Sequence, residues 1–258
     1  MHPISRCAAA IVIVTSGLIS SAHAATFDLF DTSLGSLPNA QGHLFFGDQG
    51  ISQTLTGQAV DLDSTGGGDN GRGGYTNFGF PPVLDRSNGV NLDFDLQVIS
   101  EDHSASSNRS GFSIIVLTSD LQGIELGFWE NEVWAQKGDF TQGKGASFNT
   151  TSALTSYSLQ ILGSSYSLFA DGLSLSGQLR DYSSNNIAVG GVKIYAIANH
   201  IFIGDDTQSA QGHVLLGDVT LTTAVVPLPP SVVLSLVAFA TTLSMRRKPQ
   251  AKNQAPIT

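Results

Sequence analysis

Cysteine is almost absent from this 258-residue sequence, whose single cysteine, Cys7, lies near the N-terminus. No disulfide can hold the rest of the chain together, so its stability must come from a hydrophobic core. The six histidines show no spacing typical of metal ligands, and no Ser, His and Asp set lies in a recognisable nucleophile context. The sequence therefore assigns no catalytic residue.

Basic residues are also scarce. Residues 25–226 carry all 21 Asp and Glu but only seven of the 12 Lys and Arg. These seven scattered cations do not form the clustered basic surface that binds phosphate backbones, so nucleic acid is excluded as a partner. An acidic surface keeps an exported protein soluble and can attract divalent cations.

Helical periodicity is missing from residues 25–226, and so is any repeat of fixed period. Alternation of apolar and polar residues is frequent instead. Residues 112–117 are apolar on both faces, which is typical of a central strand, and Asp171-Gly172 separates two alternating runs as in a β-hairpin. The clearest alternating strand has one apolar face, formed by Val90, Leu92, Phe94, Leu96 and Val98.

These patterns predict one all-β domain over residues 25–226, an antiparallel β-sandwich or jelly roll with 28 glycines in the whole chain to serve its turns. Two polar groups lie at apparent strand ends, Glu101-Asp102-His103 and Asp205-Asp206. Strand ends and loops are usually solvated, so we expect these side chains to face water.

The N-terminus has the pattern of a secretory signal peptide, residues 1–24. Arg6 precedes an apolar helix over Ala8–Leu18, and small residues, Ala22 and Ala24, frame a cleavage site. A retained membrane anchor is the alternative. The expected route is export.

A long hydrophobic run is missing at the C-terminus. A membrane-spanning helix needs about 20 apolar residues, whereas Val232–Leu243 is short and interrupted by Ser and Thr. Basic residues that favour the cytoplasm follow it, and prolines that hold the backbone extended precede it. The key positions are Pro227, Leu228, Pro229, Pro230, Arg246 and Arg247.

Residues 227–250 resemble the PEP-CTERM sorting signals, with Leu228 where the commonest form has Glu, and residues 251–258 form a polar tail. The resemblance implies an exosortase-type processing enzyme as partner, in a Gram-negative bacterium that makes exopolysaccharide. It also implies transient anchoring in the inner membrane by one hydrophobic helix, followed by transfer to the outer surface or release. A plain tail anchor is the alternative.

The body resembles concanavalin A-like, laminin G-type sandwiches through the hairpin YSLFADGLSLSG. More narrowly, LDRSNGVNLDFDLQVISEDH, GFSIIVLTSDLQGIELGFWENEVWAQ and FIGDDTQSA resemble the choice-of-anchor Y family. This family resemblance implies a fold and a cellular location but carries no established activity.

The stretch GIELGFWENEVWAQ contains the candidate ligand-binding residues, Glu125, Trp129, Trp134 and Gln136. An even-numbered turn around Asn131 places Glu125, Gly127 and both tryptophans on one strand face, where the indoles could stack a sugar. The alternative is that one or both tryptophans fill the core.

Glu125 and Glu130 also resemble the paired carboxylates of laminarinase-type glucanases, although Gly127 replaces the middle Asp. A glucanase-like hydrolase is therefore an alternative to a non-catalytic protein that contacts exopolysaccharide. A purely structural module without a ligand is another.

No cofactor is expected except calcium. Asp61, Asp63 and Asp69 lie among glycines in part of a calcium-loop pattern, but Arg72 occupies the position of the later acidic ligand. A flexible surface loop is the alternative.

Overall fold

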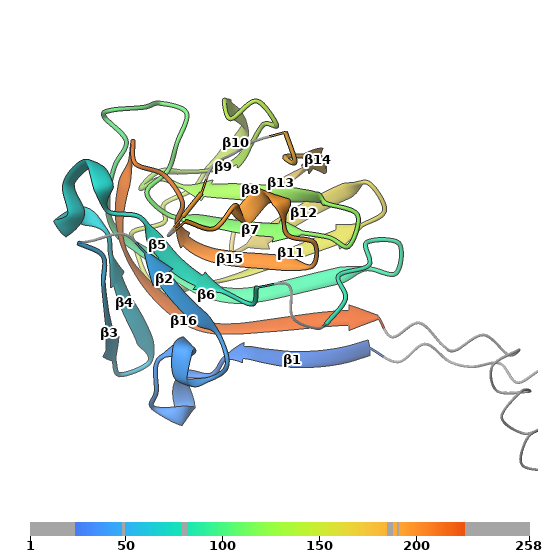
Figure 1. The fold of residues 1–258 in the computed structure, drawn as a ribbon, viewed down its shortest axis with the longest axis horizontal. Coiled ribbons are helices and arrows are strands. Elements are labelled where there is room, and N and C mark those ends of the chain that lie inside the picture. Colours follow the sequence, from blue (N-terminus) through green and yellow to red (C-terminus); the bar gives the residue numbers. More distant parts are fainter. Residues whose placement is uncertain (1–23, 48–49, 79–81, 185–187, 190, 225–258) are drawn as a thin grey trace, which may run out of the picture. The chain divides into compact units, whose positions relative to one another are not determined.

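The computed structural model describes residues 24–47, 50–78, 82–184, 188–189 and 191–224. These residues form two antiparallel sheets that pack face to face (Figure 1). The only helical elements described are short 3-10 turns: η1 (Thr32–Leu34), η2 (Pro38–Ala40), η3 (Thr65–Asn70) and η4 (Ile194–Ala196). The prediction of an all-β antiparallel sandwich is confirmed.

Sheet A contains two long neighbouring strands, β6 (Val90–Asp102) and β16 (Gln211–Ala224). On one side β6 pairs with a meander of β11 (Thr155–Leu162), β12 (Ser165–Ala170) and β13 (Leu173–Gln178). On the other side β16 pairs with β4 (Ala59–Asp63), which pairs with β3 (Ser52–Thr56), and β16 also pairs with β1 (Ala24–Phe30).

Sheet B has β7 (Ser113–Leu117) at its centre. One flank runs through β8 (Gln122–Phe128) and β9 (Glu132–Gln136) to β10 (Gln142–Ser147). The other runs through β15 (His200–Asp205) and β5 (Gly73–Thr76) to β2 (Leu44–Gly47), and the short β14 (Arg180–Asp181) pairs with β8.

The main core lies between the two sheets, as the alternating pattern predicts. The apolar face of β6 is buried there from Val90 to Val98. Phe94 of sheet A stacks on Tyr157 with ring centroids 5.1 Å apart and meets Phe128 of sheet B edge to face at 6.0 Å. The predicted hairpin is also confirmed, because Asp171-Gly172 joins β12 and β13 and Gly172 has a φ of 74°.

A second, smaller core covers the outer face of sheet B. Strand β7 is buried on both faces, as predicted for a central strand, with Ile114 and Val116 in the main core. Its other face contributes Ile115 and Leu117 to a cluster with residues of the segment after β14, which are Tyr182, Val189, Ile194 and Tyr195. We call the described parts of residues 179–199, which include β14, the covering segment.

Both ends of the described body lie next to each other, because Ala24 of β1 pairs with Ala224 of β16 (Figure 1). The rest of the predicted signal peptide and the predicted sorting signal, including Ala22, Pro227, Leu228, Pro229, Pro230, Arg246 and Arg247, lie outside the described residues. Within the described ranges, no helix has the length and hydrophobicity needed to cross a bilayer.

Candidate functional site

The tryptophan hairpin has the geometry expected from its sequence. The Trp129 amide donates to the Glu132 carbonyl at 2.9 Å, so Glu130-Asn131 is a two-residue turn, and Trp134 pairs with Gly127. An even-numbered turn puts both indoles on one face, with ring centroids 5.4 Å apart. The Trp134 ring lies against the bare backbone of Gly127.

Replacing Gly127 with Ala is therefore expected to destabilise the protein by about 1–3 kcal/mol through overpacking. A Cβ atom at this position would lie 2.8 Å from two atoms of the Trp134 ring, which is buried and has little room to move. Chemical denaturation measures the loss. Combining the change with Trp134→Phe should recover part of it, and a Gly127→Ala protein of unchanged stability would contradict this packing.

The face that carries the tryptophans is buried, which corrects the expectation of an open surface for stacking a sugar. Trp134 is 1% exposed and Trp129 8%, while Glu125 and Gln136 are equally inaccessible. The covering segment lies over Glu125, and the His103 ring stacks on Trp129 at a centroid distance of 3.9 Å. Within the face, the Gln136 side chain donates to the Thr141 carbonyl at 2.9 Å.

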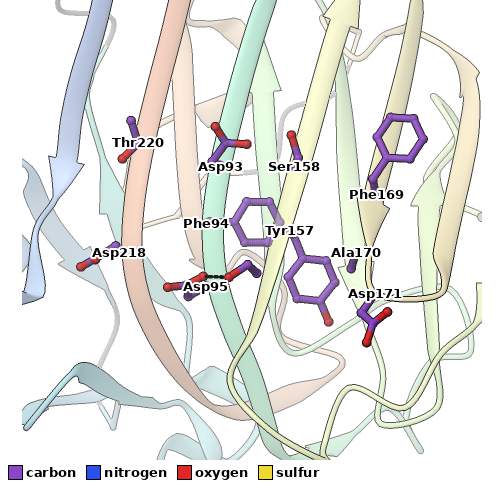
Figure 2. Close-up of a pocket in the computed structure, with 11 residues that line it drawn as sticks. Asp93, Phe94, Asp95, Tyr157, Ser158, Phe169, Ala170, Asp171, Asp218 and Thr220 are labelled. Atoms are coloured by element: carbon purple, nitrogen blue, oxygen red, sulfur yellow. Dashed lines mark hydrogen bonds between the residues drawn. The ribbon is translucent and has the colours of Figure 1, made fainter.

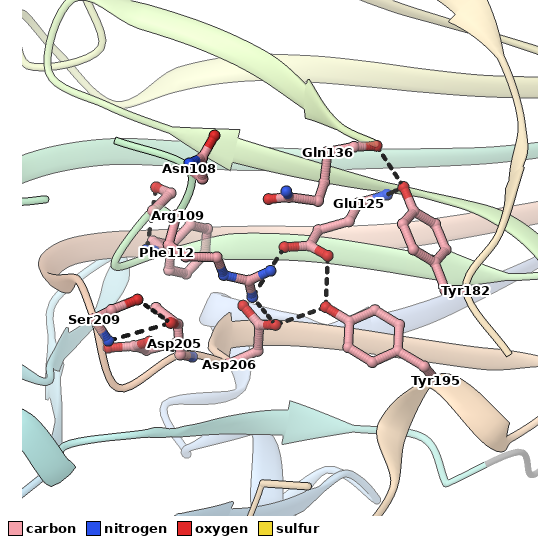
Figure 3. A network of polar contacts seen from close by, with 12 residues as sticks. Asn108, Arg109, Phe112, Glu125, Gln136, Tyr182, Tyr195, Asp205, Asp206 and Ser209 are labelled. Carbon is pink, nitrogen blue, oxygen red and sulfur yellow. Dashed lines mark hydrogen bonds and ion pairs between the residues drawn. The ribbon is translucent and has the colours of Figure 1, made fainter. Parts of the chain in front are cut away.

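The buried face is polar and charged (Figure 3). One guanidinium nitrogen of Arg109, Nη2, lies 3.3 Å from a Glu125 carboxylate oxygen and also contacts Asp206. The Tyr195 hydroxyl contacts Glu125 at 2.5 Å and Asp206 at 2.6 Å. Figure 3 shows these four side chains converging from different elements, so we call them the Arg109 cluster.

Asp205 and Asp206 lie at a strand end, as predicted, with Asp205 the last residue of β15, but they do not face water. Both are buried, and Asp205 accepts a hydrogen bond from the Ser64 hydroxyl at 2.6 Å. Burial raises the pKa of Asp205 well above its usual value. The residues that bury them come from distant parts of the chain, which a local pattern does not reveal.

The glucanase-like pair is separated by the same burial. Glu125 lies under the covering segment, and burial raises the pKa of Glu125 to about 8. Glu130 lies in the turn and is exposed. A substrate that reached Glu130 in solvent would not meet Glu125 in this conformation, so the two do not form an accessible catalytic pair.

The predicted calcium ligands have protein partners. Asp61 lies 3.0 Å from Nε2 of His213, and Asp63 accepts hydrogen bonds from the amide and hydroxyl of Thr65 at 2.8 and 2.6 Å. The side chain of Asp69 lies outside the described residues. Among described residues, no group of three or more His, Cys, Asp or Glu is arranged to hold a metal ion.

An open groove lies on the outer face of sheet A (Figure 2). It has a volume of about 430 Å³ and crosses the strands β16, β6, β11 and β12. Polar side chains on the solvent-facing side of these strands line the groove: Asp93, Asp95, Ser156, Ser158, Asp218 and Thr220. Phe169 and Asp171 lie at one side of it.

The carboxylates of this groove are oriented by neighbouring donors. Asn91 donates to Asp93 at 2.6 Å, Ser156 donates to Asp95 at 2.5 Å, and the amide and hydroxyl of Thr32 donate to one oxygen of Asp218 at 2.8 and 2.7 Å. A bulge in β16 between Leu216 and Val219 presents Asp218 on the outer face. Each of these three hydrogen-bond sets engages a single carboxylate oxygen.

A second hollow of about 500 Å³ continues the groove, since Ser156 and Asp171 line both. It is bordered by the segment before β11, residues 148–154, and by Thr155 at the start of β11. Two exposed apolar side chains stand beside the hollows, Phe169 at 42% and Leu154 at 38% exposure. Together they form a surface with polar and apolar parts that runs across the sheet.

The period of two in the strand from Val90 implies a polar second face, but no role for that face followed from the sequence. The signal was present in the alternate residues Asn91, Asp93 and Asp95 and in the turn residue Asp171. What was missing was the strand order, which places β16 and β11 on either side of β6.

Comparison with known proteins shows the fold alone. No family model matches the chain, and no curated protein matches its sequence. Among solved structures, the carbohydrate esterase vb_24B_21 from Shiga toxin-encoding bacteriophage phi24B is 14% identical, with a TM-score of 0.53 over 77% of this chain and 99% of that one.

Two further solved structures have lower TM-scores. A Bacillus subtilis protein of unknown function with a galectin-like fold is 10% identical, with a TM-score of 0.47 over 78% of this chain and 97% of its own. The VIP36 exoplasmic/lumenal domain in its Ca2+/Man3GlcNAc-bound form is 12% identical, with a TM-score of 0.44 over 74% and 87%.

Proposed function

We propose that the body is a non-catalytic module that contacts a glycan along the outer face of sheet A. The observation that carries this proposal is the groove of about 430 Å³, in which oriented carboxylates lie beside an exposed phenyl ring. Carboxylate oxygens accept hydrogen bonds from sugar hydroxyls, and an aromatic ring packs against the apolar face of a sugar. Carbohydrate sites combine these two kinds of contact.

The length of the groove favours a chain over a single sugar. The two hollows share Ser156 and Asp171 and together extend from Thr220 on β16 to the residues before β11. Both are open, so a polymer can enter and leave at either end without threading. An exopolysaccharide is a ligand of this form.

We further propose that residues 1–24 export the body and that residues 227–250 sort it, through transient anchoring in the inner membrane and an exosortase-type partner. The described body supports this arrangement because β16 ends at Ala224, three positions before Pro227. Processing near Pro227 would leave every strand of the sandwich intact.

Replacing Phe169 with Ala is expected to weaken the binding of exopolysaccharide from the producing bacterium roughly threefold to tenfold. The change removes the only exposed aromatic side chain among the described residues that line the groove. Isothermal titration with the purified polysaccharide measures the change. Leu162→Ala is a matched control, since Leu162 is an exposed apolar residue of the neighbouring strand that does not line the groove.

Three results would contradict the proposal. The first is equal affinity of the Phe169→Ala and wild-type proteins, which would place the binding surface elsewhere. The second is no binding of any polysaccharide by the wild-type protein, which would favour a structural module. The third is release of reducing sugar during the titration, which would indicate a hydrolase.

A further inference from the structure

The Arg109 cluster brings three charged side chains and a tyrosine together on the covered face of sheet B (Figure 3). Arg109 comes from the loop before β7, Glu125 from β8, Tyr195 from η4 and Asp206 from the residue after β15. All four are buried. The arrangement is independent of the glycan groove, which lies on the other sheet.

The number of protons in the cluster follows from the Tyr195 hydroxyl. This oxygen lies 2.5 Å from Oε2 of Glu125 and 2.6 Å from Oδ2 of Asp206, and both distances are those of hydrogen bonds. Burial raises the pKa of Tyr195 well above its usual value, so the phenol keeps its single proton. One proton can serve only one of the two contacts, and the other contact requires a proton on a carboxyl group.

The charges of the cluster also indicate one proton on a carboxyl group. With both carboxylates ionised, Arg109 leaves the cluster with a net negative charge in a region of low dielectric, which is costly. One carboxyl proton makes the cluster neutral. Burial is also the largest cause that raises the pKa of Glu125 to about 8, and Arg109 opposes it only in part.

Other groups around Glu125 do not neutralise it. From the covering segment, the Tyr182 hydroxyl donates to the Gln136 carbonyl at 2.7 Å and accepts from the Glu125 amide at 3.2 Å. Arg109 also packs on the Phe140 ring at 4.9 Å. Asp205 contacts Ser64 and the Thr207 amide, away from the cluster, so Arg109 is the only cation whose contact with Glu125 is seen in the described residues.

We propose that Glu125 and Asp206 hold one proton between them through Tyr195, and that loss of this proton in mildly alkaline solution weakens attachment of the covering segment to sheet B. The cluster then attaches the covering segment to sheet B in a pH-dependent way. The shared proton allows the Tyr195 hydroxyl to form hydrogen bonds with both Glu125 of β8 and Asp206 at the end of β15. When this proton is lost, two negatively charged carboxylates face the same phenol oxygen.

The direction of the pH effect follows from linkage. The pKa of Glu125 is higher in the folded than in the unfolded chain, so its stabilisation is complete below about pH 4.5 and is lost as the pH rises through about 8. Between these values the loss of one proton increases the unfolding equilibrium constant by at most about tenfold per pH unit. Burial raises the pKa values of Glu101 and Asp205 too, so the wild-type slope has several sources.

The experiment compares the wild-type protein with Glu125→Gln, an uncharged side chain of the same shape. Urea unfolding from pH 5 to 9 should show a shallower loss of stability in the variant, because Glu101 and Asp205 titrate in both proteins and cancel in the difference. Hydrogen exchange at the amides of Tyr182 and Tyr195 should accelerate with pH more steeply in wild type than in the variant.

Infrared spectroscopy gives a second readout. The wild-type protein at pH 6 should show a band of protonated, buried carboxyl groups. Glu101 and Asp205 contribute to this band in both proteins, so Glu125 accounts for the part that is missing from Glu125→Gln, and this difference should disappear between pH 7 and 9. Parallel unfolding curves for the two proteins would overturn the proposal. So would a carboxyl band that titrates identically in the two proteins over this range.

Discussion

Replacing Arg109 with Met is expected to lower the free energy of unfolding by about 3–5 kcal/mol at neutral pH, which is the typical cost of removing one partner from a buried ion pair. The substitution leaves Glu125 and Asp206 buried without the cation that contacts both. Met has a similar length and can still pack against Phe140, so the loss reports mainly on charge. Urea unfolding measures it.

Arg86→Met is the matched control. Arg86 forms an ion pair with Asp120 at 2.8 Å, but both side chains are accessible to solvent. Water and salt screen such a pair, so its loss should change stability little. Similar losses in the two variants would contradict the assignment of the Arg109 cluster as a buried charge centre.

The two variants should also differ in their response to pH. Arg109 opposes the effect of burial on the pKa of Glu125, so without Arg109 this pKa rises further above its value in the unfolded chain. The unfolded state then binds fewer protons than the folded state, so the deficit of the Arg109→Met protein grows as the pH rises. It should be smallest near pH 5 and larger at pH 8.

Much of the sandwich could be predicted because its strands carry local patterns. The run from Val90 has a period of two, residues 112–117 are apolar throughout, and Asp171-Gly172 has turn chemistry. The pairing of both tryptophans on one face also followed from a local feature, the even-numbered turn around Asn131. Each of these outcomes depends on neighbours in sequence.

The covering segment could not be predicted in the same way. The covering segment has little regular secondary structure. Its buried residues Tyr182, Ile194 and Tyr195 show no strand or helix period. Its position depends on contacts with β7 and β8, which are remote in sequence. The sequence therefore indicated which residues share the tryptophan face but not that another layer of the protein lies on it.

Sites formed by several strands have the same difficulty. Arg109 appears in the sequence as one of seven scattered cations, and only the fold brings it to Glu125 and Asp206. The groove on sheet A needs the strand order β16, β6, β11 and β12, in which only β11 and β12 are consecutive. Side-chain chemistry was visible from the sequence, whereas the non-local partners were not.

Replacing Trp134 with Ala is expected to lower the free energy of unfolding by about 3–5 kcal/mol, because the indole fills a buried space between Gly127 and Trp129. Trp134→Phe should cost less, since it leaves most of the volume and breaks no hydrogen bond of the indole that is seen among the described residues. Thermal and urea unfolding would rank the three proteins.

Polysaccharide affinity separates this packing role from a binding role. If Trp134 fills a core and the groove on sheet A binds the glycan, folded Trp134→Phe protein should bind the polysaccharide as tightly as wild type does. Phe169→Ala should show the reverse pattern, with weaker binding and little loss of stability, because Phe169 is 42% exposed. A Trp134→Phe protein that is stable but no longer binds would return the ligand to the tryptophan face, since a change confined to a buried ring cannot alter a groove on the opposite sheet without also altering the fold between them.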